Sequence, residues 1–141
     1  MQDFYGQYKF LIIPASLWCA IQLFKVAYDY RKTKKFNVKR LLGAGGMPSS
    51  HTAVVVSLAT MIGKYIGTNT PMFALSAIVA FITMYDAAGV RRAVGKQAHV
   101  LNEVIQNQNM TSAEKLQEMT GHTPVQVAAG AGLGLIVGLL V

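Results

Sequence analysis

Residues 43–63 read GAGGMPSSHTAVVVSLATMIG, and they place glycine, proline, serine and histidine directly before a long apolar run. Glycine and proline shape the backbone, and serine favours the N-cap of a helix. The pattern predicts a helix that begins near Ser50 and holds His51 in its first turn. A histidine at the start of an apolar helix needs a chemical reason, which the rest of the chain helps to identify.

The whole chain is as apolar as this stretch. Of its 141 residues, 52% are hydrophobic and 13% are charged. Soluble domains carry about 25% charged residues, so roughly half of the expected charge is absent. The composition therefore indicates a membrane protein with a single domain over residues 1–141. A soluble bundle of fully buried helices stays open, because helical periodicity alone does not separate buried helices from lipid-facing ones.

Four apolar segments approach the length of a membrane span, which is about 20 residues of helix. They lie at 8–30, 50–67, 71–90 and 123–141. We expect the first segment to be retained rather than cleaved as a signal peptide, since Asp3 precedes it and a basic leader is missing. The expected fold class is all-α: an integral membrane helical bundle with about four transmembrane helices.

Basic residues gather in two of the connections. The run RKTKKFNVKR at 31–40 follows the first segment, and Arg91, Arg92 and Lys96 follow the third. The positive-inside rule places both connections in the cytoplasm and both termini outside. The net charge of +7 favours contact with anionic lipid headgroups. Nucleic acid is not expected as a partner, because aromatic residues do not interleave with the basic run.

The third connection predicts further helices. Apolar residues between Val90 and Ile105 recur at helical spacing, which predicts an amphipathic helix near the membrane interface. A second, capped helix is expected to begin at Thr111 or Ser112 and to end near Gly121.

His51 and His122 open the second and fourth segments. Alternate spans run in the same direction, so both helices are expected to begin on the basic face. A helix N-terminus has unpaired N–H groups and favours bound anions such as phosphate. Ser49 and Ser50 add hydroxyl groups next to His51. Imidazole is suited to attack phosphorus and to protonate a leaving oxygen, so the pattern predicts a phosphate-handling site.

Other interpretations of the same residues remain open. The serines are explained equally by a simple N-cap, and an interfacial histidine by an amphipathic side chain. A metal site built from His51, His122 and Asp86 is disfavoured, because HxxxH and HExxH spacings are absent and the surroundings are cationic. We expect no metal and no cofactor, with phosphate oxygens neutralised by Arg91, Arg92 and Lys96.

The motifs GGMPSSHTA at 45–53, YDAAGVRRAVGKQA at 85–98 and GHTPVQVAAGAGLG at 121–134 resemble those of the membrane-bound type 2 phosphatidic acid phosphatases. These enzymes belong to the acid phosphatase and vanadium haloperoxidase superfamily, and the chain resembles most its small divergent branch. The resemblance implies that His122 is the nucleophile, that His51 is the general acid, and that Ser49 binds phosphate.

The chain departs from that family's pattern at several positions. Ser50 replaces the glycine of the Pro-Ser-Gly-His motif, and Gln126 replaces the aspartate that orients the nucleophile. Leu116 stands where the family has a phosphate-binding arginine, and Lys39 and Arg40 stand in for the basic first motif. Asp86 is the expected replacement for the aspartate, because an acid within a membrane span is a functional-site candidate. The alternative for Asp86 is a salt bridge to a neighbouring arginine.

The expected function is hydrolysis of a lipid phosphomonoester or diphosphate through a phosphohistidine intermediate. A non-catalytic protein that binds or transports lipid phosphates is the alternative, favoured by Gln126. A purely structural membrane protein is the third. Gly130 and Gly134 form a GxxxG spacing that predicts close helix packing, and the glycine-rich fourth segment offers a candidate homodimer interface.

Overall fold

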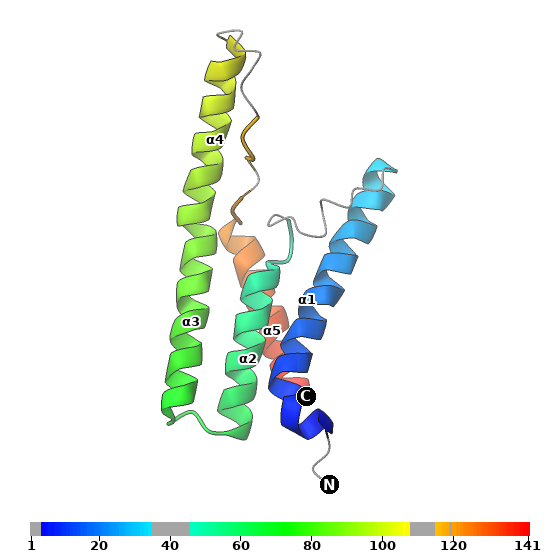
Figure 1. Cartoon of the computed structure of the whole chain (residues 1–141), viewed down its shortest axis with the longest axis vertical. Coiled ribbons are helices and arrows are strands. Elements are labelled where there is room, and N and C mark those ends of the chain that lie inside the picture. Colours follow the sequence, from blue (N-terminus) through cyan, green and yellow to red (C-terminus); the bar gives the residue numbers. More distant parts are fainter. Residues whose placement is uncertain (1–3, 35–45, 108–114, 119) are drawn as a thin grey trace.

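The computed structural model describes residues 4–34, 46–107, 115–118 and 120–141, and most of these residues are helical (Figure 1). Five helices follow one another along the chain: α1 (Phe4–Thr33), α2 (Ser50–Tyr65), α3 (Pro71–Ala88), α4 (Val90–Asn107) and α5 (Pro124–Leu140). The described ranges contain no β-strand. The all-α prediction is confirmed, and α2 begins at the residue that the serine–histidine motif predicts.

α2 is the central helix of the bundle. It packs against α1, α3 and α5, and it runs in the same direction as α5. α1 and the α3–α4 pair run in the opposite direction, so both chain termini lie at one end of the molecule (Figure 1). Leu17 and Ile21 of α1 meet Ala53 of α2 in the buried core, and Leu133 and Val137 of α5 pack on this cluster.

Glycines bring α5 into close contact with α2. A Cβ atom at Gly130 would lie 2.5 Å from the carbonyl oxygen of Ser49, and one at Gly134 would lie 2.4 Å from that of Ala53. Small residues allow such backbone approach between helices. The prediction of close packing at the GxxxG spacing is confirmed. This glycine face is buried against α2 within the chain, so a homodimer would use another surface, and the homodimer itself stays a prediction.

α3 and α4 are joined almost without interruption. The N–H of Gly89 donates to the oxygen of Tyr85, and the N–H of Ala93 donates to the oxygen of Gly89. The ladder therefore crosses the junction, and Figure 1 shows α4 continuing the axis of α3. The expected amphipathic helix is present, but it extends α3 instead of turning across the end of the bundle.

Two helical stretches of the described chain are long and apolar enough to cross a membrane. They are Tyr8–Thr33 and the 37-residue stretch Pro71–Asn107. α5 is a shorter apolar helix, and α2 has 16 residues. The count of four spans stays a prediction.

The segment after α4 is not the helix expected from the sequence. Residues 111–114 lie outside the described chain, but residues 115–118 are non-helical and run beside α4. The Asn102 side chain donates to the oxygen of Leu116 and accepts from its N–H, both at 2.9 Å. These two hydrogen bonds satisfy the N–H and carbonyl groups of Leu116, which would otherwise bond to other backbone groups within a helix. Gly95 allows the close approach, since a Cβ there would lie 2.4 Å from the Glu118 oxygen.

Candidate functional site

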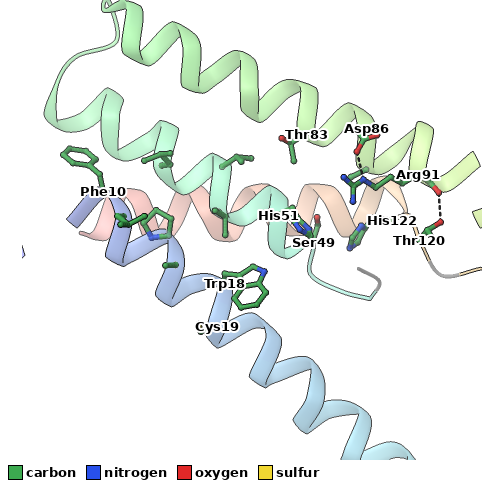
Figure 2. A pocket seen from close by; sticks show the side chains of 17 residues that line it. Phe10, Trp18, Cys19, Ser49, His51, Thr83, Asp86, Arg91, Thr120 and His122 are labelled. Carbon is green, nitrogen blue, oxygen red and sulfur yellow. Dashed lines mark hydrogen bonds and ion pairs between the residues drawn. The ribbon is translucent and has the colours of Figure 1, made fainter. Parts of the chain in front are cut away.

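A cavity of about 760 Å³ brings together residues from four helices and the segment before α5 (Figure 2). At one end it is lined by polar and charged side chains: Ser49, His51, Thr83, Asp86, Arg91, Thr120 and His122. The rest is lined mainly by apolar side chains: Phe10, Leu11, Pro14, Ala15, Trp18, Cys19, Val54, Val55, Leu58 and Ala87. The two histidines that the sequence singles out therefore line one cavity, as their position at parallel helix starts predicts.

The backbone that carries His122 is held against the α3–α4 junction. The His122 N–H donates to the oxygen of Ala87 at 3.0 Å, and the Thr120 hydroxyl donates to the oxygen of Arg91 at 3.0 Å. Between them, a Cβ at Gly121 would lie 2.3 Å from the backbone nitrogen of Arg92. Only glycine fits at this position, so the nucleophile candidate stands on a fixed backbone.

The imidazole of His122 is buried and neutral. Its side chain is 3% exposed, and neither ring nitrogen has a hydrogen-bond partner among the described residues. Burial lowers the pKa of His122 to about 4, and the positive charges of Lys25, His51 and Arg91 act in the same direction. At neutral pH the ring therefore keeps a free lone pair, as a nucleophile requires.

Lys25 is a residue of the site that the sequence analysis missed. It lies within α1 and is 3% exposed, and its charge acts on His122. The signal was available, because a charged residue inside an apolar span usually faces the protein interior and serves a function.

Ser49 and His51 occupy the start of α2. Ser49 is fully buried at the N-cap position, but its side chain makes no capping bond. Its hydroxyl lies 2.9 Å from that of Thr52, and its N–H donates to the oxygen of Gln126 at 3.1 Å. The hydroxyl lines the cavity while the N–H is already bonded. The simple N-cap interpretation therefore explains the position of Ser49 in the backbone, but it does not explain why the hydroxyl faces the cavity instead of capping the helix.

The structure separates the other predicted phosphate ligands. Ser50 is 2% exposed and does not line the cavity. Arg92 and Lys96 line a second cavity of about 540 Å³ on another side of α4, whereas Arg91 lines the first. Lys39 lies outside the described residues. Among the predicted cations that the structure describes, Arg91 is the one that lines the histidines' cavity.

Within the described chain, neither Asp86 nor Gln126 forms a hydrogen bond with the ring of His122. Asp86 and Arg91 form an ion pair with Oδ2 and Nε 2.5 Å apart, drawn in Figure 2, so the salt-bridge alternative for Asp86 is confirmed. The side-chain oxygen of Gln126 accepts from the N–H of Thr123 at 3.0 Å, and the Thr123 hydroxyl accepts from the N–H of Gln126. Gln126 therefore caps α5 and leaves His122 without an orienting partner.

The cavity combines a neutral imidazole, a second histidine and cationic surroundings, a set that suits an anionic substrate. Within the described chain, no three His, Cys, Asp or Glu side chains converge as metal ligands.

Comparisons with known proteins identify the family to which the chain belongs. A family model described as the divergent PAP2 family matches residues 7–137. The chain is 36% identical over 133 residues to YuiD of Bacillus subtilis (strain 168), described as an uncharacterized membrane protein, and the match covers 84% of each chain. No solved structure matches the chain significantly.

Proposed function

Because the chain belongs to the divergent PAP2 family, we propose that it is a multi-pass membrane phosphatase that hydrolyses a lipid phosphomonoester or diphosphate. One observation carries the proposal. The buried imidazole of His122 has no hydrogen-bond partner among the described residues and lines a cavity with His51 and Arg91. A nucleophile, a proton donor and a phosphate-binding guanidinium are the groups that phosphate transfer to histidine requires.

The reaction has two steps. A ring nitrogen of His122 attacks phosphorus while the bond from phosphorus to the lipid oxygen breaks, and the protonated ring of His51 gives its proton to that oxygen. A water molecule that loses its proton to His51 then attacks the phosphohistidine, which releases inorganic phosphate and restores both rings. Arg91 and the Ser49 hydroxyl stabilise the charge on the phosphate oxygens, and the buried charge of Lys25 contributes to the field.

Asp86 enters the reaction by exchanging partners. Its carboxylate holds Arg91 in the anion-free site. A phosphate dianion binds a guanidinium through two parallel hydrogen bonds, so substrate draws Arg91 away from Asp86. The released carboxylate, which lines the same cavity as His51 and His122, then stabilises a positively charged imidazole as acids do in catalytic triads.

The membrane arrangement is part of the proposal. α1, α2, α3 and α5 each span the bilayer, with the polar end of the cavity at the cytoplasmic face. α2 and α5 begin at that end, and α1 ends there with Arg31 and Lys32 in its last turn. This charge bias supports the orientation. The cationic surface also suits anionic lipid headgroups.

A second candidate function is non-catalytic binding or transport of a lipid phosphate. It is favoured by the capping role of Gln126, which leaves His122 without a hydrogen-bonded carboxylate. Such a protein keeps the anion-binding cavity but releases no inorganic phosphate.

The deciding experiment measures inorganic phosphate release from lipid phosphates and prenyl diphosphates by the purified protein. His51→Ala and His122→Ala are expected to lose release, since each removes a group that the reaction needs. His99→Ala is the matched control, because that exposed imidazole pairs with Glu103 and Glu118 away from the cavity. Full release by His122→Ala contradicts the phosphatase mechanism. Vanadate binding without release by the wild type favours the carrier.

A further inference from the structure

The cavity that holds His51 and His122 extends far beyond its polar end. Its longer part, the apolar arm, is lined by Leu11, Ala15 and Trp18 of α1 and by Val54, Val55 and Leu58 of α2. Phosphate transfer uses none of these side chains. Most of the side chains that line the cavity therefore have no role in the reaction.

The apolar arm runs along α2, away from the histidines. His51, Val55 and Leu58 lie four and three residues apart, which places them on one face of the helix. From His51 to Leu58 the helix rises about 10 Å. Phe10 lies at the far end of the cavity in Figure 2, and its ring meets that of Tyr65 edge-on at a centroid distance of 6.0 Å. Phe10 therefore borders the arm at the end opposite the histidines, and Tyr65 supports its ring.

The arm opens to the side of the bundle. α1 and α3 both pack on α2, but in the described chain they make no contact with each other. They flank α2 in Figure 1, and α3 contributes no side chain before Thr83 to the cavity, so the arm is lined from α1 and α2 alone. In a membrane-spanning bundle this opening faces the hydrocarbon core, from which an acyl or isoprenoid chain enters without crossing water.

We propose that the apolar arm binds one hydrocarbon chain of the substrate while the phosphate group lies between His51 and His122. The inference rests on the proposed function and narrows its substrate class to long-chain membrane lipids. The Phe10–Tyr65 pair limits the depth to which the chain enters. A second chain, where the lipid has one, stays in the bilayer outside the opening between α1 and α3.

The test fills the arm from each wall, with Leu58→Trp from α2 and Ala15→Trp from α1. The control is Leu75→Trp on α3, where the side chain is 65% exposed and lines no part of the cavity. Phosphate release is measured from short-chain and long-chain phosphatidic acid in the same micelles. We expect each arm variant to lower the long-to-short ratio of kcat/KM about tenfold, the effect of leaving two methylene groups unburied. An unchanged ratio in both arm variants overturns the proposal.

A binding measurement separates failure of the arm from failure of the phosphatase. Trp18 lines the cavity and is the only tryptophan of the chain. Phosphatidic acid with brominated chains is expected to quench its fluorescence more than brominated phosphatidylcholine at the same mole fraction, and Arg91→Gln is expected to remove the excess. Equal quenching by the two lipids overturns the arm. Excess quenching without any phosphate release upholds the arm and contradicts the phosphatase.

Discussion

Substitution of Gly134 by alanine tests the packing that holds the site together. A Cβ at Gly134 would lie 2.4 Å from the carbonyl oxygen of Ala53 and 3.0 Å from the backbone nitrogen of Ser57. Both atoms belong to the backbone of α2, so neither moves away by a rotamer change. α5 must retreat from α2, and the contacts on either side of the glycine loosen with it.

The expected cost follows from two opposing terms. Overpacking a well-packed interface costs about 1–3 kcal/mol. Alanine is favoured over glycine within a helix by about 1 kcal/mol, which partly offsets that cost. Gly132 provides the matched control on the same helix, because a Cβ there has no heavy atom within 4 Å. Gly132→Ala gains only the helix preference of alanine and has no overpacking cost. The free energies of unfolding of the two variants are therefore expected to differ by about 1–3 kcal/mol.

Unfolding by dodecyl sulfate in mixed micelles, followed by circular dichroism, measures this difference, and light scattering of the same samples gives the oligomeric state. Equal stability of the two variants refutes the close contact between α2 and α5. A Gly134→Ala protein with unchanged stability but a smaller oligomer restores the homodimer assignment of the GxxxG face.

Three further predictions follow from the site. The pKa of His122 is about 4 in the native state and 6.5 without burial, so the stability that neutral His122 contributes is complete above pH 6.5 and is lost as the pH falls toward 4. The unfolding midpoint is therefore expected to fall with pH over this range. In His122→Phe this pH dependence is expected to be absent. Gly95→Ala is expected to displace the segment at Glu118 from α4, because a Cβ at position 95 would lie 2.4 Å from the Glu118 oxygen. Faster hydrogen exchange at residues 115–118 reports the displacement, and unchanged exchange contradicts the close contact. Asp86→Asn is expected to bind vanadate up to about fivefold more tightly, because Arg91 no longer has a competing carboxylate. The same variant is expected to release phosphate more slowly, because it lacks the carboxylate that stabilises the charged imidazole. Unchanged vanadate affinity together with unchanged phosphate release contradicts the exchange of partners.

The features predicted correctly from the sequence are those set by local pattern. The serine–histidine motif predicts the start of α2, because a capping residue followed by an apolar run specifies a helix without tertiary contacts. The shared cavity of His51 and His122 follows from the alternating direction of consecutive helices. Neither prediction requires knowledge of which helix faces touch.

The features that the sequence did not predict depend on packing between distant segments. Arg91 and Arg92 are neighbours in sequence, yet they line different cavities, because the backbone at Gly121 lies against α4 between them. The non-helical course of residues 115–118 depends on the side chain of Asn102, a contact that no local pattern in that segment specifies.

The cationic surroundings of His122 serve two states of the proposed reaction. In the anion-free site, burial and the charge of Lys25 keep the imidazole neutral and nucleophilic. Asp86 is the only acid among the described residues that line the cavity, and Arg91 holds it. A bound phosphate brings negative charge close to Lys25 and Arg91 and compensates their positive charges. The free-energy cost of a positively charged imidazole at His122 therefore falls once substrate is bound. In the proposed reaction the substrate itself thereby supplies part of the negative charge that the resemblance assigns to an aspartate, so glutamine at position 126 is compatible with His122 as the nucleophile.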